Sequence, residues 1–424
     1  MKPPVSNIHG HLSNKRTLAR PGLAIRSLAR QVFAEVAVRG MLWRRRQRRQ
    51  GDPAARGVAV YGFLETASGL GAAARGFLVA IESLKPKPIS ITPFAPTPPM
   101  PDACGAHNAG VNDSSHGFDV GVHIYNPDVF LGLVRRFGGK LLLPNRLNLA
   151  VVNWETQRPP SSWPAVLSLY DRLAAPSRFT ADALSRATGR EVHVLPNCVP
   201  VRPPRARTRT DSHYEFLCIF DAHSDFDRKN PLAAICAFCQ AASDLPRDVS
   251  CRLRVKCHSN TPPTMLAMLK AAAGGACVEI IAKTLSEDGM QRLWAECDCL
   301  VSLHRSEGFG LPVAEALARG IPVVVTRQGG ILDFIDDRGG LLIDGVPAVP
   351  GPAGSASGYH EWSGWVEPDI QSAAAAMRQV MNNYPAAAAR ARNGRQRLGD
   401  YTAPNAVRQA YLSAVSADAV SQYR

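Results

Sequence analysis

The sequence predicts an α/β protein made of two doubly wound domains, each with a parallel β-sheet that helices cover on both faces. Beyond Gly57, short runs rich in Val, Ile and Leu alternate with helical stretches, which is the pattern of strands buried on both sides. The 424 residues, 46% of them hydrophobic, exceed one domain of about 150 residues and supply apolar surface for two cores. A ligand of such a protein is expected in the central cleft, between the carboxyl ends of the two sheets.

Runs of β-branched and aromatic residues mark the expected strands in chain order. The first half offers Val58–Tyr61, Ile89–Thr92, Val120–Ile124, Leu149–Asn153, Arg172–Ala175 and Val192–Leu195. The second half offers Phe216–Phe220, Leu253–Cys257, Val278–Ile281, Leu300–His304 and Pro322–Thr326. Each half therefore holds enough strands for a sheet of its own.

A polar stretch divides the two halves. Pro203, Pro204 and four arginines lie close together there, with almost nothing apolar between them, as expected for a linker. The expected organisation is a basic arm at 1–56, a first domain at 57–200, the linker at 201–212, a second domain at 213–385 and C-terminal helices at 386–424. A return of the last helices to the first domain is one option.

The formal net charge of +14 is concentrated in the arm. Residues 1–56 carry 13 basic side chains and two acidic ones, so the other 368 residues contribute only +3. The body is therefore nearly neutral, which argues against nucleic acid as a partner. Within the arm, residues 23–43 predict a basic amphipathic helix, and five arginines follow at positions 44–49.

Three interpretations of the arm stay open. A basic amphipathic helix with an aromatic end suits an anionic membrane surface, which would make the protein peripheral on the cytoplasmic face. A solvated extension without a partner explains the composition equally well. Arginine richness with few acids also resembles an organelle transit peptide.

The remaining composition points to a cytoplasmic protein. The ten cysteines lack two paired clusters with a matching histidine set, so core thiols in a reducing compartment are expected and a zinc site is not. No run of 18 apolar residues predicts a membrane-spanning helix. Arg26, Arg30 and Arg39 interrupt the N-terminal apolar segment, which argues against a cleaved secretion signal.

Residues 300–326 concentrate features of an anion site. A predicted strand ends at His304, and Gly308 and Gly310 in the following loop allow close approach of backbone amides to a ligand. Pro312 suits the first helical position, where its missing N–H is not needed. Free N–H groups and the positive end of the helix dipole therefore meet at one place, and an anion is expected there.

Two carboxylates flank that expected anion site. Glu307 lies in the loop before the helix, and Glu315 is expected in its first turn. Beside phosphates these carboxylates suit the hydroxyl-rich ends of a nucleotide sugar, with ribose on one side and hexose on the other. The alternative is that Glu315 only complements the helix dipole and that Glu307 is a surface acid, each contributing a few tenths of a kcal/mol.

A cation precedes another expected helix. Lys229 comes directly before Asn230 and Pro231, and Pro231 is expected to begin the helix. A lysine at this end opposes the helix dipole unless an anion lies between them, in which case it would stabilise a leaving diphosphate. The alternative is a solvated pair, Arg228 and Lys229.

The first half offers candidates for the acceptor side. Gly69 and Gly71 follow a strand and precede an expected helix at 72–84, which could place amides against a diphosphate across the cleft. His123 ends one expected strand, and Trp154 with Glu155 follows another, so both positions border the crevice. A satisfied core histidine is the alternative for His123.

One motif resembles a known family. The run HRSEGFGLPVAEALARGIPVVVT from His304 is similar to the glutamate, seven residues, glutamate signature of retaining glycosyltransferases of family 4. Other segments agree: SGLGAAARGF from Ser68, NWETQRPPSSW from Asn153, APSRFTADAL from Ala175, VLPNCV from Val194, RKNP from Arg228 and WVEPD from Trp365. The likeness covers the chain from about Gly57 onward. It implies the GT-B fold, with two Rossmann-like domains facing a central cleft.

The resemblance assigns roles to the motif. It implies that Glu307 lies near the donor sugar and the transferred carbon and that Glu315 hydrogen-bonds the ribose. The amides of Phe309, Gly310 and Leu311 would meet the sugar and the phosphates.

The resemblance also assigns the diphosphate to Lys229, and here the sequence departs from the family. Members usually have an arginine five positions before this lysine, whereas this chain has Ser224. Either Arg228 or Arg305 substitutes for it, or diphosphate binding is weaker. A second departure is Ile331 after Gly330, where relatives often have asparagine.

The sequence thus predicts a retaining glycosyltransferase that moves a sugar from a nucleoside diphosphate sugar to a glycan or lipid-linked glycan, in cell-envelope or extracellular polysaccharide synthesis. No cofactor is expected, and no metal either, because no Asp-x-Asp motif stands out at a strand end. Two alternatives stay open: a catalytically weak, membrane-associated binding protein, and a GT-B sugar-nucleotide epimerase.

Overall fold

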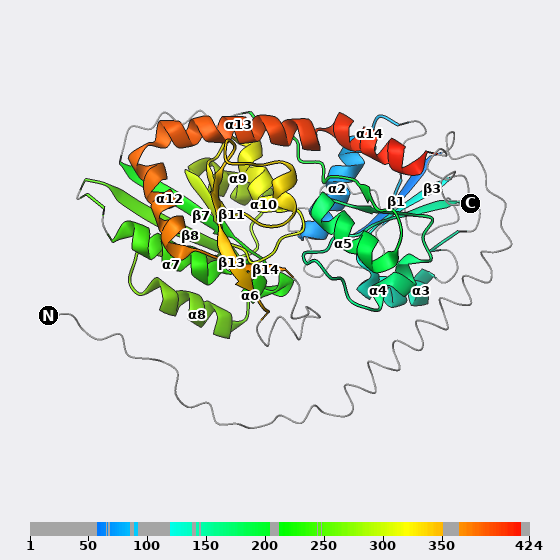
Figure 1. Ribbon diagram of the computed structural model, residues 1–424, viewed down its shortest axis with the longest axis horizontal. Helices are drawn as coiled ribbons and strands as arrows, with labels where there is room; N and C mark the ends of the chain where they lie inside the picture. The colour runs from blue at the N-terminus through cyan, green and yellow to red at the C-terminus, as the bar shows by residue number, and fades with distance from the viewer. Residues whose placement is uncertain are drawn as a thin grey trace, which may run out of the picture.

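A computed structural model of the chain shows two lobes side by side (Figure 1). It describes residues 57–84 apart from 65 and 67, and residues 89–91, 119–137, 141–143, 146–203, 212–243, 245–246, 248–350 and 364–416. The basic arm at 1–56 lies outside the described residues, as does most of the expected linker.

The N-terminal lobe is built on a six-stranded parallel sheet in the order β2-β1-β3-β4-β5-β6. Its strands are β1 (Val58–Gly62), β2 (Ile89–Ile91), β3 (Val120–Ile124), β4 (Leu147–Val151), β5 (Arg172–Ala175) and β6 (His193–Val194). Its helices are α2 (Gly69–Ile81), α3 (Phe130–Phe137), α4 (Trp163–Leu167) and α5 (Arg178–Thr188), with a 3₁₀ turn at Pro127–Val129.

Alternating side chains of the strands supply a core on each face of this sheet. Val58 and Val60 of β1 face the helix α2, whereas Ala59 and Tyr61 face the side covered by α3, α4 and α5. This alternation follows from the two-residue period of a strand, and burial on both faces explains the continuous apolar runs.

The C-terminal lobe repeats the design with the order β12-β11-β10-β7-β8-β9. Its strands are β7 (His213–Ile219), β8 (Ser250–Cys257), β9 (Val278–Ala282), β10 (Cys299–Ser302), β11 (Val323–Thr326) and β12 (Leu341–Ile343). Its helices are α6 (Phe226–Lys229), α7 (Pro231–Ala242), α8 (Pro263–Ala273), α9 (Glu287–Glu296), α10 (Leu311–Ala318) and α12 (Ile370–Asn382), with 3₁₀ turns at Ala222–Ser224 and Gly330–Asp333.

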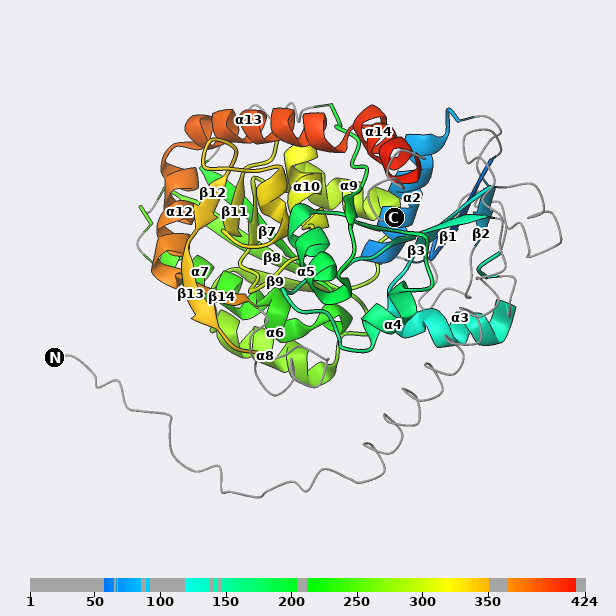
Figure 2. The same ribbon diagram turned by 45° about the vertical axis from the view of Figure 1, so that its right-hand side comes forward.

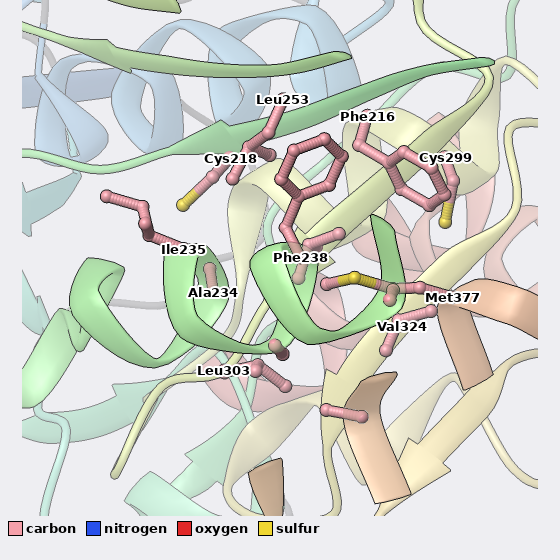
Figure 3. Packing of buried hydrophobic residues seen from close by; sticks show 14 of the residues in the cluster. Phe216, Cys218, Ala234, Ile235, Phe238, Leu253, Cys299, Leu303, Val324 and Met377 are labelled. Atoms are coloured by element: carbon pink, nitrogen blue, oxygen red, sulfur yellow. The ribbon is translucent and has the colours of Figure 1, made fainter. Parts of the chain in front are cut away.

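One face of this second sheet packs on α7 and α12. Phe238 of α7 meets Phe216 of β7 edge to face, with ring centroids 5.9 Å apart, and Met377 of α12 closes the cluster (Figure 3). The other face packs on α9 and α10. The expectation of two parallel sheets, each covered on both faces, is therefore confirmed.

The last two helices connect the lobes. Helix α13 (Tyr384–Thr402) runs along the C-terminal lobe, and α14 (Pro404–Val415) lies on α2 of the N-terminal lobe (Figures 1 and 2). Val407 and Tyr411 of α14 belong to the core of that lobe, and the Tyr411 ring meets Phe77 of α2 at a centroid distance of 5.4 Å.

A short hairpin was not expected from the sequence. Strands β13 (Gly345–Ala348) and β14 (Trp365–Pro368) pair antiparallel, with Val346 opposite Glu367. Trp365 is only 1% exposed and packs in the core of the N-terminal lobe, although the hairpin belongs to the C-terminal half of the chain. The hairpin is therefore a second connection between the lobes.

Candidate functional site

The site lies where neighbouring strands of the C-terminal sheet end. Strands β7 and β10 are adjacent and parallel, so the segments that follow them meet at one edge of the sheet. The chain after β7 forms the short helix α6, which carries Arg228 and Lys229, and the chain after β10 forms the loop that carries Glu307. Residues about 80 positions apart in sequence thus come together.

Glu307 forms the centre of a charged cluster. Its Oε2 lies 2.5 Å from Nζ of Lys229 and 3.5 Å from Nη1 of Arg228. Burial acts to raise the pKa of this carboxyl, but the charges of Lys229 and Arg228 outweigh it and lower the pKa to about 2. Glu307 is therefore ionised at neutral pH and paired with two cations, in contrast to a solvated surface acid.

Arg228, one of the two expected substitutes for the arginine that Ser224 replaces, contacts Ser224 directly. Its guanidinium is fully buried and donates to both the carbonyl oxygen and Oγ of Ser224, at 2.6 and 2.7 Å. It also donates to the carbonyl oxygen of Ser306 at 2.9 Å. The Arg228 guanidinium thus lies against Ser224 and beside Glu307.

Arg305, the other expected substitute, is engaged elsewhere. Its guanidinium pairs with Glu367 of β14 and donates to the carbonyl oxygen of Asp227. Among the described contacts, those of Arg228 and not those of Arg305 reach Glu307.

The glycine loop fits tightly between the two lobes. An added Cβ at Gly308 would overlap the carbonyl oxygen of Trp154. The carbonyl oxygen of Gly308 accepts a hydrogen bond from Oγ of Ser177 at 2.5 Å. Gly310, the N-cap of α10, has a φ of 85°, which only glycine adopts readily. The loop conformation therefore depends on both glycines.

The N-terminal ends of two helices converge on this region. The helix α2 begins at Gly69, and a Cβ placed on Gly69 would lie 3.8 Å from Cδ1 of Leu311, the first residue of α10. In α2 the N–H of Gly71 donates to Oγ of Ser68 at 3.2 Å, whereas α10 has no side-chain cap; each helix end carries about half a positive charge. The helix α2 starts three residues earlier than expected. An added Cβ at Gly71 would overlap the carbonyl oxygen of Thr66, so Gly71 lets the helix approach its own preceding loop.

Glu315 lies in different surroundings from Glu307. Because α10 begins at Leu311, Glu315 comes after the first turn of the helix, one position beyond expectation. Burial raises its pKa, opposed mainly by the charge of Arg319 and more weakly by that of Arg75 on α2. Glu315 thus faces arginines from both lobes, while Glu307 faces the α6 cations.

Glu155 brings a carboxylate from the N-terminal lobe to the same cluster. Its Oε1 lies 3.5 Å from Nη2 of Arg228, its side chain is 23% exposed, and its backbone carbonyl accepts a hydrogen bond from Ser306. Burial raises its pKa, opposed by the charge of Arg228. Arg228 is therefore shared by carboxylates from both lobes.

Trp154 does not present its ring to the cleft. The ring is 6% exposed and packs edge to face on Trp163 inside the N-terminal lobe, with centroids 4.7 Å apart. Strand β4 ends at Val151, two residues earlier than expected, so Trp154 and Glu155 lie in the following loop. The backbone of Trp154 faces Gly308, and Glu155 alone of this pair points its side chain at the charged cluster.

His123 is enclosed in the core of the N-terminal lobe. It is fully buried, stacks on Tyr61 with centroids 4.5 Å apart, and its Nδ1 lies 2.8 Å from the hydroxyl of Tyr125. Burial lowers its pKa to about 3, so the ring is neutral. These contacts match the alternative of a satisfied core histidine, and they do not place His123 at the acceptor surface.

Phe309 likewise points into a core. Its ring is 4% exposed and lies 5.3 Å from that of Phe334, between α10 and the turn at Gly330–Asp333. Ile331 in that turn packs against Gly310, where an added Cβ would overlap its side chain. Ile331, the second departure from the family pattern, therefore packs beneath the loop.

Three hydroxyl residues of the site were missed from the sequence. Ser177 and Thr180 of the N-terminal lobe hold Gly308 and Trp154, and Ser306 holds Glu155. Ser177 also caps α5 by accepting from the N–H of Thr180, so the capping pattern was the available signal, but it gave no indication of a partner in the other lobe.

The described residues contain no cluster of three or more His, Cys, Asp or Glu side chains with the spacing of a metal site. Every cysteine among them carries a free thiol. Within the same part of the chain, each helix is too short or too polar to cross a bilayer.

The sequence matches a model of the family described as family 4 glycosyltransferase in conflict systems. The match covers residues 177–410, more than half of the chain, and includes the α6 cations and the whole loop from Glu307 to Leu311. The chain therefore belongs to the family 4 glycosyltransferases. The family resemblance of the motif is confirmed.

Curated relatives support the same class over shorter stretches. The D-inositol 3-phosphate glycosyltransferase of Xylanimonas cellulosilytica is 29% identical over 195 residues, which is 42% of this chain and 46% of the relative. The trehalose synthase of Rubrobacter xylanophilus is 48% identical over 50 residues, 12% of either protein. The matched segments thus span less than half of these relatives.

Solved structures share the fold. HepE of Anabaena, solved in complex with UDP and glucose, has a TM-score of 0.59 at 14% identity, covering 86% of this chain and all of HepE. The sucrose-phosphate synthase of Thermosynechococcus elongatus also has a TM-score of 0.59 at 14% identity, covering 85% and 98%. The expected GT-B fold is confirmed.

Proposed function

We propose that the protein is a retaining glycosyltransferase that moves a sugar from a nucleoside diphosphate donor to a hydroxyl of a glycan or a lipid-linked glycan. The observation that carries the proposal is the cluster of Glu307, Lys229 and Arg228 next to the converging ends of α2 and α10. Cations and helix ends suit the diphosphate, and the carboxylate suits the hydroxyls of the sugar.

In this mechanism the protein stabilises the leaving group. Nζ of Lys229 has three donors, so it can keep its bond to Glu307 and still hold a phosphate oxygen. Charge develops on the diphosphate as the glycosidic bond breaks, and the fixed cations and helix ends counter it without rearrangement. The family resemblance supports attack from the face that the diphosphate leaves.

Glu315 and the loop amides complete the donor side of the proposal. Glu315 would bind the ribose hydroxyls. Burial raises the pKa of this carboxyl and the charges of Arg319 and Arg75 lower it, so hydrogen-bond donors from a ribose would further stabilise the charged form. The amides of Gly308, Phe309, Gly310 and Leu311 would meet the sugar and phosphates.

The acceptor would approach from the N-terminal lobe, next to Glu155. That side chain reaches the charged cluster from across the cleft, and one of its oxygens has a contact of 3.5 Å with Arg228. A carboxylate with spare acceptor capacity can take a hydrogen bond from an acceptor hydroxyl.

The first experiment is a thermal-shift screen of nucleoside diphosphate sugars, followed by turnover with radiolabelled donor. A ligand at 100 times its dissociation constant adds about 2.7 kcal/mol of stability. Turnover should be lost in Glu307→Gln and kept in Glu191→Gln, a matched change on the surface of the N-terminal lobe. Turnover that is equal in both variants would refute the assignment of the site.

The proposal includes independence from metal ions. Turnover should survive chelation by EDTA, because cations of the protein and helix ends take the role that a metal would have. Full loss on chelation, with recovery on adding a divalent ion, would refute this part. Products formed without acceptor would instead indicate a sugar-nucleotide epimerase.

The arm supports a further part of the proposal, a cytoplasmic location at the membrane and a role in envelope or extracellular polysaccharide synthesis. Removing residues 1–56, which carry a charge of +11, should release the protein from anionic vesicles and leave turnover on a soluble acceptor largely intact. Vesicle binding that is unchanged by the deletion would contradict the membrane interpretation.

The alternative of a catalytically weak, membrane-associated binding protein rested on Ser224 together with the basic arm. The argument from Ser224 is weaker because the guanidinium of Arg228 lies against Ser224 and next to Glu307, where it could hold the diphosphate.

A further inference from the structure

The helix that carries the two cations sits between two strained residues. Asp225 before α6 has a φ of 73°, and Asn230 after it has a φ of 49°. Among the described residues these are the two non-glycine positions with positive φ, a conformation that side chains with a Cβ seldom adopt. Such strain persists only where surrounding contacts impose it, and it concentrates at functional sites.

The strained residue that follows Lys229 is held from outside the helix. Asn230 is 3% exposed, and its Nδ2 donates to Oε1 of Glu367 on β14 at 3.2 Å. The other oxygen of Glu367 accepts from Nε of Arg305, two residues before Glu307. One carboxylate of the hairpin thus connects the segment that ends with Lys229 to the segment that leads into Glu307.

Backbone contacts tie the same three segments together. The N–H of Arg305 donates to the carbonyl oxygen of Arg228 at 2.8 Å, and the N–H of Val366 donates to the carbonyl oxygen of Arg305 at 2.9 Å. Strand β14 lies beside α6 (Figure 1). Trp365, two residues before Glu367, is buried in the N-terminal lobe. The hairpin is therefore anchored in that lobe while Glu367 contacts Asn230 at the end of α6.

We propose that Glu367 is a positioning residue, which acts through Asn230 and Arg305 to set Lys229 and Arg228 against Glu307 in the geometry that binds the diphosphate. This inference rests on the proposed function and deepens it. Glu367 does not touch the donor. It fixes the orientation of the Lys229 and Arg228 side chains. Without it, that orientation would depend only on the short helix α6, which lies between Asp225 and Asn230, both with positive φ.

The first test measures binding of UDP and of inorganic pyrophosphate by titration calorimetry in the full chain. Glu367→Ala should raise both dissociation constants about five- to tenfold, because a hydrogen bond to a charged group is lost at a partly exposed site. Glu367→Gln keeps an oxygen for one partner and should lose less. The donor KM should rise, and the acceptor KM should stay unchanged.

Asp344→Asn is the matched control on the hairpin. Asp344 directly precedes β13 and pairs with Arg327 at 2.6 Å, away from α6. Its loss disturbs the base of the hairpin and leaves the Glu367 contacts in place, so binding of both probes should match the parent protein. A weakening equal to that of Glu367→Ala would show a general effect of hairpin stability and overturn the inference.

A double-mutant cycle separates positioning from general stability. If Glu367 acts through Lys229 and Arg228, Glu367→Ala should weaken UDP binding less in the Lys229→Ala variant than in the parent protein, because only Arg228 is left to position. A full additional loss in the double variant would overturn the inference.

Exchanging the hydrogen-bond donor and acceptor between Asn230 and Glu367 tests whether UDP binding can be restored without shortening either side chain. Asn230→Asp alone places two carboxylates together and should weaken UDP binding about tenfold, because like charges repel at close range. Adding Glu367→Gln to that variant restores a donor and an acceptor with reversed roles, and binding should recover to near the level of Glu367→Gln alone. No recovery would overturn the inference.

Failure of the inference can be told from failure of the proposed function. If the parent protein binds neither a nucleoside diphosphate nor pyrophosphate, the proposed function is wrong and the inference falls with it. If the parent binds UDP and Glu367→Ala binds it equally well with unchanged donor KM, the inference alone is wrong.

Discussion

The carboxyl ends of the two sheets carry opposite chemistry, although the sheets share one design. In the C-terminal lobe the strand ends hold ionised groups, with Glu307 bound to Lys229 and Arg228. In the N-terminal lobe His123, within β3, is a neutral ring that stacks on Tyr61 and has its Nδ1 2.8 Å from the hydroxyl of Tyr125. The contrast sets a charged strand end in the C-terminal lobe against a neutral core histidine in the N-terminal lobe, which still contributes Glu155 to the charged cluster.

The pKa directions express the same contrast. Charges of neighbouring cations hold the pKa of Glu307 low, at about 2, so its charge is stabilised by the fold. Burial raises the pKa of Glu155 and lowers that of His123 to about 3, so on the N-terminal side the fold disfavours charge. Substitutions on the two sides should therefore differ in kind as well as in size.

The largest effect should come from removing the cation of the charged side. Lys229→Ala should lower kcat by about a hundred- to a thousandfold, the usual loss for one preorganised group that stabilises a leaving oxyanion. Steady-state kinetics with a saturating donor measure it. Lys283→Ala, an exposed lysine of the same lobe, is the control and should leave kcat unchanged. A comparable loss of kcat in the two variants would show that Lys229 contributes no more to turnover than an exposed lysine.

Glu307→Gln should reveal a stability that depends on pH. The folded pKa lies below the ordinary value of 4.5, so the ionised carboxylate stabilises the fold above pH 4.5, and this contribution is lost as the pH falls toward 2. At pH 7 the variant should be less stable by on the order of 3 kcal/mol. Urea titrations between pH 7 and pH 3 should show the difference shrinking. A constant difference would contradict the ion-pair explanation.

His123→Ala should damage the fold and spare the chemistry. Removing a buried, hydrogen-bonded ring should lower the free energy of unfolding by about 2 to 4 kcal/mol. Because the pKa is lowered from 6.5 to about 3, the neutral histidine contributes its full stability above pH 6.5. This contribution is lost as the pH falls from 6.5 toward 3.

Denaturant titration and turnover per folded molecule check this expectation together. His123→Phe keeps the volume and should recover part of the stability. A loss of kcat at intact stability would instead assign His123 a direct role at the acceptor.

The smallest effect should be a gain. Burial raises the pKa of Glu155, so the stability linked to its protonation is fully present below pH 4.5 and is lost as the pH rises through the folded pKa. Glu155→Gln should therefore be more stable than the parent at pH 7, and the gain should vanish near pH 4.

The acceptor KM of Glu155→Gln should rise at the same time, because a hydrogen-bond acceptor is lost at the proposed acceptor side. Thermal melts across pH and initial rates at varied acceptor measure the two effects. A destabilised variant with unchanged acceptor KM would make Glu155 a plain ion-pair partner of Arg228.

Much of the fold could be predicted because its strands are buried on both faces and therefore form continuous apolar runs. The strands at Val120–Ile124 and Arg172–Ala175 have the expected bounds. The hairpin of β13 and β14 was missed because it is short and its strands carry prolines and an exposed valine, Val346. Its pairing depends on contacts with distant segments that no local pattern encodes.

The site was predictable where chemistry is local in sequence and not where it depends on the other lobe. Glycines and a proline at a strand-to-helix junction predict an anion site, and the structure brings Glu307 and Lys229 together there. The position of Arg228 against Ser224 follows from the conformation of α6, including the positive φ of Asp225. The contacts of Ser177 and Glu155 cross between the lobes, so spacing alone could not assign them.

The return of the last helix has a consequence for synthesis on the ribosome. Val407 and Tyr411 complete the core of the lobe that is translated first. That lobe therefore keeps an apolar face open until α14 has been synthesised, whereas the sheet of the C-terminal lobe consists of its own strands. The N-terminal lobe, although synthesised first, should therefore complete its folding after the C-terminal lobe. A premature stop before residue 404 should leave its core exposed, so that chaperones or proteases bind the protein.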